Sequence, residues 1–272
     1  MTDLNPQREQ MADESMVRNL AAQATAIWPQ EAALFRRYGL APDIRILDAG
    51  CGTGEISARL AEMYPLAKVL GIDVIEEHLA YGREKFAQFV PRLSFEKQDV
   101  FALPAADATY DLTVCRHVVQ AVPHVDRVIA ELARVTKPGG VVHVIAEDYN
   151  MMHFPADLPG VREFWNDAPA QFGAANGVDN FVGRHTWAYF RAAGLVDVTV
   201  DYVIVDTIRV PRETFAAVIT AWRDGYAEPI SQFTKWSYED ARRCFDLTIG
   251  AILDPSKYCV WMVPVIAGRK QA

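Results

Sequence analysis

The sequence lacks the features of several large protein classes. Its 272 residues include only four cysteines, which are scattered and form no CxxC pair. A disulfide framework is therefore excluded, and reduced thiols in the cytosol are expected. No apolar run approaches the roughly 20 residues that span a bilayer. The first thirty residues carry acidic side chains instead of the apolar core of a signal peptide. We therefore expect a cytoplasmic protein with no membrane partner.

Positive charge is also scarce. The chain has 27 basic and 35 acidic residues, a formal net charge of −8. No Lys/Arg run is longer than two residues, as at Arg36 and Arg37. Proteins that hold a nucleic-acid backbone usually present a basic stripe, because phosphate contacts supply most of the affinity. We expect no nucleic-acid partner, and nothing in the sequence indicates an oligomeric state.

Short apolar strands alternate with amphipathic helices in the middle of the chain. Such alternation predicts a doubly wound α/β fold with a mostly parallel sheet and helices on both faces. The expected strands are residues 44–47, 68–72, 93–97, 110–115 and 141–146. The expected helices are residues 55–64, 75–89 and 125–135.

The flanking segments have a different pattern. Residues 10–38 predict two helices separated at Pro29, which suits the first turn of the second helix. Residues 150–184 are typical of a loop, with several Pro, Gly and Asn. A helix at 186–193, a strand at 196–207, helices within 211–257 and a strand at 258–267 are expected to follow. These patterns divide the chain into an N-terminal helical cap (1–40), a core (41–210 and 258–272) and a helical lid insertion (211–257).

A glycine-rich loop follows the first strand and opens a helix. It contains Asp48, Gly50, Gly52 and Gly54. The dinucleotide fingerprint GxGxxG places its third glycine where this chain has Glu55. A carboxylate there disfavours a pyrophosphate, which needs positive potential at the helix N-terminus. S-adenosylmethionine carries no phosphate and has a cationic sulfonium and ammonium, so an acidic loop suits it.

Four ordered motifs resemble those of class I, Rossmann-like S-adenosylmethionine-dependent methyltransferases of the small-molecule type. They are the loop at 48–54, residues 71–73, residues 98–100, and the strand, helix and turn at 110–140. The resemblance covers residues 44–146 continuously, and the last two strands more loosely. It implies a seven-stranded sheet with an antiparallel last strand.

The resemblance also implies roles for residues beyond the loop. Asp73, with Val74 beside it, would bind the ribose hydroxyls of the cofactor. Asp99 would accept a hydrogen bond from the adenine amino group, and the backbone of Val100 would face the adenine ring. The backbone of Arg116 would hold the methionine part.

Catalytic candidates follow the fourth and fifth strands, whose ends point toward the cofactor. His117 has an imidazole that can take a proton at neutral pH, or it caps the next turn without proton transfer. Glu147, Asp148 and Tyr149 can bind an amine acceptor or orient a hydroxyl. The alternative is a solvated loop, which is favoured at least equally for Asp148. No His and carboxylate pair has metal-ligand spacing on one helix, so we assign no metal. His143 is expected to be packed or at a strand edge. A surface or helix-end position is expected of three other histidines: His78, His124 and His185.

The acceptor is expected to be a small molecule bound under the lid. The lid aromatics either form its own core or face the acceptor, and most are expected in the core. They are Phe215, Trp222, Tyr226, Phe233, Trp236, Tyr238 and Phe245.

The leading hypothesis is methyl transfer to a nitrogen or oxygen without metal, and the resemblance extends to enzymes of bacterial secondary metabolism. The alternatives are a cofactor-binding regulatory or partner subunit without turnover, an RNA or protein methyltransferase, and, disfavoured by Glu55, a nicotinamide-dependent oxidoreductase.

Overall fold

The alternating strands form one mostly parallel sheet in the computed structural model, which describes residues 4–272. Within those residues the sheet has eight strands in the order β3-β2-β1-β4-β5-β8-β6, and β7 also pairs with β8. Strands β1 to β5 run parallel, and β8 is antiparallel to β5, β6 and β7. The expected fold class is confirmed, with one strand more than expected. The strands are β1 (Arg45–Ala49), β2 (Lys68–Asp73), β3 (Leu93–Lys97), β4 (Tyr110–Arg116), β5 (Thr136–Ile145), β6 (Met152–His153), β7 (Leu195–Asp206) and β8 (Val260–Lys270).

The additional strand is β6, which has only two residues. It pairs through Met152 with Trp261 and through His153 with Val260. So short a strand has too few residues for a period-2 pattern, which is why the sequence did not indicate it.

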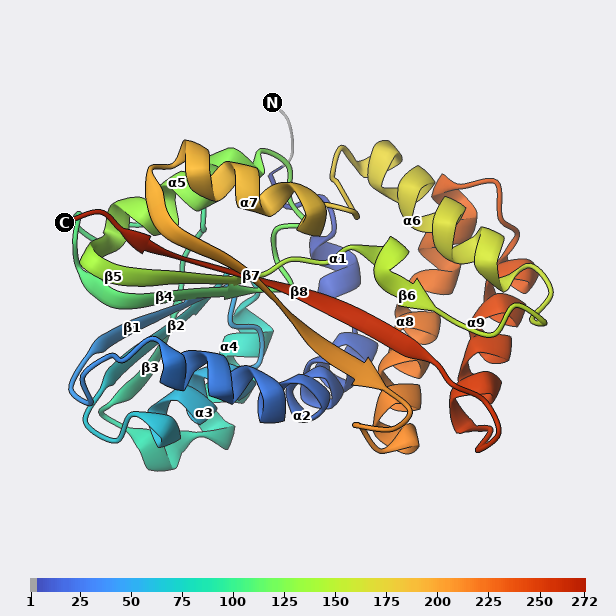
Figure 1. The fold of residues 1–272 in the computed structure, drawn as a ribbon, viewed down its shortest axis with the longest axis horizontal. Coiled ribbons are helices and arrows are strands. Elements are labelled where there is room, and N and C mark those ends of the chain that lie inside the picture. The colour runs from blue at the N-terminus through green and yellow to red at the C-terminus, as the bar shows by residue number, and fades with distance from the viewer. Residues whose placement is uncertain (1–3) are drawn as a thin grey trace.

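Helices cover both faces of the sheet, as the alternation predicts (Figure 1). Helices α5 (Val125–Val135) and α7 (Gly183–Ala192) pack on one face around a core that includes Leu132 and Phe190. Helices α3 (Glu55–Met63) and α4 (Glu76–Lys85) pack on the other. Short 3-10 turns lie at η1 (Ala87–Phe89) and η2 (Tyr149–Met151). This arrangement leaves the carboxyl ends of the parallel strands open for a ligand.

The N-terminal segment forms one long helix where two were expected. After the short α1 (Arg8–Met11), α2 runs from Glu14 to Arg37 through Pro29. An interior proline lacks the donor for its helical hydrogen bond and costs about 3 kcal/mol. Ile27 and Phe35 are fully buried on either side of it, so packing offsets the loss. Residues 1–3 of the expected 1–40 cap lie outside the described residues.

The segment expected to be a loop contains a helix, α6 (Val161–Asn176). Pro169 and the glycines around the segment suggested a loop, but Gly160 and Gly177 lie just outside the helix in the left-handed conformation. Phe164 and Phe172, two turns apart on α6, are buried. Tertiary packing therefore outweighs the local loop signal.

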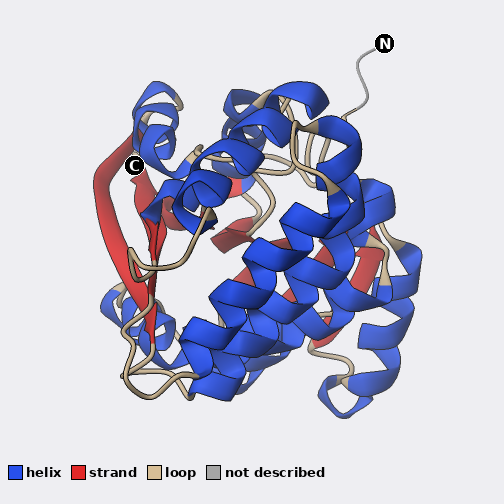
Figure 2. Cartoon of the chain, turned by 90° about the vertical axis from the view of Figure 1, so that its right-hand side faces the viewer, coloured by secondary structure: helices blue, strands red, loops and turns tan. Residues whose placement is uncertain are grey.

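Helix α6 packs with the expected helices of the lid, α8 (Arg212–Phe233) and α9 (Tyr238–Leu253). Their shared core includes Phe164, Phe245 and Trp261 of β8. Strands β7 and β8 extend from the sheet into this helical half of the molecule (Figure 1). Seen from that end, the helices lie across the front and strands lie behind and beside them (Figure 2).

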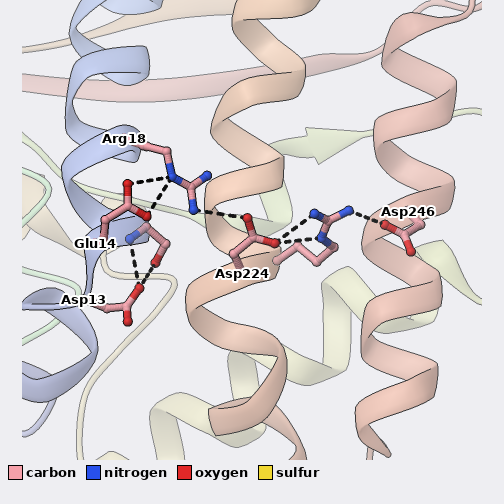
Figure 3. Close-up of polar contacts among 7 residues, drawn as sticks. Asp13, Glu14, Arg18, Asp224 and Asp246 are labelled. Atoms are coloured by element: carbon pink, nitrogen blue, oxygen red, sulfur yellow. Dashed lines mark hydrogen bonds and ion pairs between the residues drawn. The ribbon is translucent and has the colours of Figure 1, made fainter.

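A chain of ion pairs joins α2 to the lid on the surface (Figure 3). Arg18 Nη2 lies 3.2 Å from Asp224 Oδ2 on α8. Arg223 lies 2.8 Å from Asp224 and 2.7 Å from Asp246 on α9. Exposed pairs of this kind contribute little each, so these contacts add little to the stability of the packing between α2 and the lid.

Candidate active site

A cavity lies at the carboxyl ends of the strands, between the sheet and the lid. Its wall comes from the N-terminal helices, the glycine-rich loop, the segments after β2, β3, β4 and β5, and helices α6, α8 and α9. It encloses about 1410 Å³, including its opening to solvent. A hollow at the carboxyl ends of parallel strands is where open α/β sheets bind ligands.

The glycine-rich loop approaches the cavity without side chains. Gly50 and Gly52 line the wall and have positive φ angles of 73° and 52°. A Cβ on Gly50 would lie 2.3 Å from Cγ2 of Val118, and one on Gly52 would lie 2.7 Å from Cδ1 of Leu20. Both backbone conformation and space therefore require glycine here. Gly54 is the N-cap of α3, where a Cβ would lie 2.5 Å from the ring of Phe95, and it does not line either cavity.

Asp73 holds two backbone segments at the end of β2. Its Oδ2 accepts a hydrogen bond from the Gly52 amide at 2.8 Å, and its Oδ1 accepts from the Ile75 amide at 3.0 Å. Asp73 and Val74 both line the cavity. Each carboxylate oxygen keeps a lone pair after these bonds, so Asp73 can still accept hydroxyl groups of a ligand.

Asp48 lies in a smaller cavity that adjoins the first. Gln23, Gly50, Arg116 and His117 line both cavities. Asp48 is almost fully buried, and the hydroxyl of Ser57 donates to its Oδ2 at 2.6 Å. Burial raises the pKa of Asp48 to about 6 and outweighs the opposing effect of that hydrogen bond. A cationic ligand group nearby would stabilise its ionised form.

The segment after β3 places Val100 in the cavity wall and its neighbour Asp99 outside it. Gln98 and Val100 line the cavity. Asp99 is not in that wall, as far as the described residues show, and its Oδ1 accepts from the Phe101 amide at 2.9 Å. A role for Asp99 toward the adenine amino group stays a prediction.

Arg116 belongs to a buried polar network that the sequence did not indicate. Its Nε donates to Glu31 Oε1 at 2.8 Å, and Nε2 of His143 donates to the same oxygen at 3.0 Å. Nδ1 of His143 lies 2.7 Å from the hydroxyl of Tyr38. Burial alone would raise the pKa of Glu31, but Arg116 and His143 outweigh it and hold that pKa below its usual value. His143 is packed, as expected, and stacks on Phe35.

Glu31 could have been noticed in the sequence. It lies four residues after Ile27, on the apolar face of the N-terminal helix. A charged residue on such a face needs a buried partner, and the sequence did not show which residue supplies it. Asn19 and Gln23, eight and four residues before Ile27, are likewise buried and line the cavity.

His117 and Glu147 meet where β4 and β5 end. Nδ1 of His117 lies 2.5 Å from Oε1 of Glu147. His117 has a positive φ of 56°, and its amide donates to the carbonyl of Ile145 at 3.0 Å. Nε2 of His117 and Oε2 of Glu147 are buried without a hydrogen-bond partner among residues 4–272. Since a carboxylate only accepts, Nδ1 carries the proton between them, and Nε2 has a lone pair whenever the ring is in its neutral form.

Tyr149 and Asp148 have separate surroundings. Tyr149 lines the cavity and meets the ring of Trp222 edge-on at 5.6 Å. Burial and the nearby Glu147 raise the pKa of Tyr149, so the phenol stays protonated and can donate. The expectation of a solvated loop at Asp148 is wrong. Asp148 is fully buried and accepts two hydrogen bonds of 2.6 Å from Arg184.

His78 lies in the first turn of α4, so the helix-end alternative holds for it, whereas the surface alternative is wrong. It is 3% exposed, lines the cavity, and its Nε2 has no partner within the described part of the chain. Burial lowers the pKa of His78. His124 caps the start of α5 and His185 is exposed, as expected.

Three of the seven expected lid aromatics face the cavity, namely Trp222, Tyr226 and Phe245. Phe215 is buried in the core of the lid, and Phe233 and Tyr238 are exposed. Helix α6, which the sequence did not predict, adds Phe164, Trp165 and Phe172 to the wall.

Two curated bacterial proteins are similar to the chain in sequence. A trans-aconitate 2-methyltransferase of Deinococcus radiodurans is 38% identical over 162 residues, which are 58% of this chain and 60% of the relative. A ubiquinone/menaquinone biosynthesis C-methyltransferase of Cereibacter sphaeroides is 35% identical over 106 residues, 38% of this chain and 42% of the relative. The chain therefore matches 60% or less of the length of these relatives.

The fold is similar to that of phosphoethanolamine N-methyltransferase 2 of Haemonchus contortus in complex with S-adenosyl-L-methionine. The TM-score is 0.58 at 17% identity, over 90% of this chain and 53% of that one. Identity this low supports the fold alone. A methyltransferase domain family matches residues 40–182, just over half of the chain. The chain therefore belongs to the class I, S-adenosylmethionine-dependent methyltransferase domains.

Proposed function

We propose that this protein transfers a methyl group from S-adenosylmethionine to a nitrogen or oxygen of a small-molecule acceptor, without a metal. One observation carries the proposal. His117, whose Nε2 has no partner within the described residues, lines the same cavity as the glycine-rich loop, which supports a proton acceptor beside the cofactor site. Methyl transfer from a sulfonium needs alignment first and a base only when the acceptor arrives protonated.

The cofactor end of the cavity fits S-adenosylmethionine. Gly50 and Gly52 leave room for a ligand against the backbone, and Asp73 can accept the ribose hydroxyls. Arg116 Nη2 and Thr53 Oγ1 are buried donors without a partner in the described chain. They suit the carboxylate of the cofactor, and Asp48 suits its ammonium. When bound, the cofactor supplies an electrophilic methyl group.

The residues of the chain position the acceptor and move one proton. Glu147 fixes His117 with Nε2 free to take the proton from the acceptor. Tyr149 donates a hydrogen bond, and helices α6, α8 and α9 exclude water. We assign α6 to the lid together with 211–257, take the rest of 41–210 with 258–272 as the core, and keep 1–40 as the N-terminal cap.

The alternatives differ in what the cavity must admit. An RNA or protein acceptor needs an open groove, whereas lid helices cover this cavity. A binding subunit without turnover would not need the His117–Glu147 pair.

The four cysteines are unpaired and buried, which supports a reducing compartment, so we place the protein in the cytoplasm. No helix among the described residues has the length and apolarity to cross a membrane. A role in secondary metabolism is part of this proposal and rests on the sequence resemblance.

Calorimetric titration with S-adenosylhomocysteine, with NADH in parallel, tests the cofactor. We expect micromolar binding of the first and none of the second, and binding of NADH alone would reject the proposal. His117→Asn tests the catalytic role, because asparagine tolerates a positive φ. It should lower turnover more than cofactor affinity. Equal losses in both would reduce His117 to a cofactor contact.

A further inference from the structure

The lid end of the cavity is aromatic. Its wall there includes Phe164, Trp165, Phe172, Trp222, Ile230 and Phe245. Several of these rings meet edge to face, as Trp165 and Phe245 do at 5.4 Å and 88°. Packed rings of this kind bind a flat apolar ring through further stacked or edge contacts. The body of the acceptor is therefore expected to be flat and apolar.

The charged side chains of the cavity wall do not favour an anionic acceptor. The wall contains the carboxylates of Asp73 and Glu147 and the guanidinium groups of Arg8 and Arg116. Arg116 is already engaged by the fully buried Glu31 at 2.8 Å. A polycarboxylate would lose its hydration here and gain too little positive charge in return.

Three buried, unpartnered atoms of wall residues indicate which polar group the acceptor must bring. Gln120 Oε1, Glu147 Oε2 and His117 Nε2 are buried, have no partner within residues 4–272, and belong to residues of the wall. The two oxygens can only accept hydrogen bonds, and Nε2 accepts while Nδ1 carries the proton. A ligand that satisfies them must donate, as a hydroxyl or an N–H does and a carboxylate does not.

From these three observations we propose that the acceptor is an uncharged aromatic hydroxyl compound, a phenol, whose oxygen is methylated. This inference rests on the proposed methyltransferase function and names its substrate class. The phenolic O–H bond breaks, and its proton goes to Nε2 of His117. The oxygen forms a bond to the methyl carbon of the sulfonium donor, whose S–C bond breaks and leaves a neutral thioether. The products are an aryl methyl ether and an imidazolium, which releases its proton to solvent.

An aliphatic amine fits these observations less well. It would enter as an ammonium ion and would have to lose its hydration among aromatic side chains before it lost a proton. Only Oε2 of Glu147 is left to offset that charge, because its Oε1 is bound to His117. A phenol carries a donor without a charge.

Calorimetry on the protein saturated with S-adenosylhomocysteine tests the substrate class. The probes are naphthol, naphthoate, naphthylmethylamine and trans-aconitate. The first three share the aromatic ring and carry a hydroxyl, a negative charge and a positive charge, respectively. Trans-aconitate is charged and lacks the ring. We expect naphthol to bind more than roughly tenfold tighter than each of the other three, a difference of about 1.4 kcal/mol. Tighter binding of naphthoate, naphthylmethylamine or trans-aconitate overturns the phenol inference. Failure of S-adenosylhomocysteine itself to bind would instead overturn the proposed function.

A separate measurement tests whether the phenolic proton goes to His117. Para-nitrophenol, added at a pH below its own pKa to the same complex, should give the nitrophenolate absorbance band on binding to the wild type. The His117→Asn variant should bind the probe without that band. Binding without the band in the wild type, or an unchanged band in the variant, overturns His117 as the proton acceptor.

Discussion

Arg116 at the end of β4 and Glu31 on α2 are joined by a hydrogen bond of 2.8 Å in a fully buried setting. The pair connects the N-terminal helix to the cavity wall, and Nη2 of Arg116 is left for a ligand. Glu31→Gln would leave the guanidinium without its counter-charge. Removing one partner of a buried pair costs about 3 to 5 kcal/mol. Urea unfolding should show that loss, and titration should show weaker binding of S-adenosylhomocysteine.

Glu14→Gln is the matched control, because Glu14 pairs with Arg18 on the exposed face of the same helix. It should change the free energy of unfolding by less than about 1 kcal/mol. A similarly small loss for Glu31→Gln would contradict the importance of the buried pair.

Gly50→Ala should abolish most of the affinity for the cofactor. The new Cβ would lie 2.3 Å from Val118, at a φ of 73°. Either the loop or Val118 must shift, so we expect more than a roughly tenfold rise in Kd for S-adenosylhomocysteine, about 1.4 kcal/mol.

Gly139→Ala is the control that separates the backbone strain of a positive φ from the steric overlap expected at Gly50. Gly139 has a φ of 77°, and a Cβ there would meet nothing within 4 Å. The substitution should cost about 1 to 2 kcal/mol of stability from the backbone alone and leave the Kd unchanged. Equal effects of the two variants on Kd would indicate that Gly50 acts through stability only.

Asp48 should make stability depend on pH in a defined direction. Burial raises its pKa from 3.8 to about 6 in the folded protein. Its contribution is therefore fully present below pH 4 and is lost as the pH rises through 6. The difference corresponds to roughly 3 kcal/mol at 1.36 kcal/mol per pKa unit.

Asp48→Asn removes this titration. Between pH 4 and pH 7 the variant should gain stability relative to the wild type by an amount near that value, as measured by urea unfolding without ligand. A difference between the two proteins that is constant with pH would mean that Asp48 titrates normally.

The surface ion pairs between α2 and the lid should matter little for stability. Asp224→Ala removes both the contact with Arg18 and that with Arg223. Because exposed pairs contribute about 0.2 to 1 kcal/mol, we expect a fall in Tm of a few degrees at most, and a smaller one in high salt. A large, salt-independent fall would show that Asp224 has a structural role that these contacts do not explain.

The sequence predicted the parts of the fold that local patterns encode. Strand and helix alternation from 44 to 146 gave the parallel sheet, because each element there has its own periodicity. It also placed His117 and Glu147 at adjacent strand ends. It did not predict their contact, which depends on the left-handed backbone at His117 and on the pairing of β4 with β5.

The wrong predictions are those in which packing overrides local signals. Pro29 and Pro169 suggested breaks, yet each lies inside a helix that buries apolar side chains on both sides of it. The surface alternative for His78 and the solvated loop for Asp148 are wrong. Their burial depends on partners and neighbours distant in sequence, such as Arg184 for Asp148, which no local pattern indicates.

The lid helices α8 and α9 begin and end at neighbouring points of the sheet. Asp206 and Val260 face each other in the pairing of β7 with β8, and the Thr207 amide donates to the carbonyl of Cys259 at 3.1 Å. Residues 207–259 therefore form a segment whose two ends are held together by a backbone hydrogen bond. Exchange of this segment between related enzymes would keep the sheet register and the cofactor loop intact. Recombination at these two positions offers a route to new acceptor preferences, whether by evolution or in the laboratory.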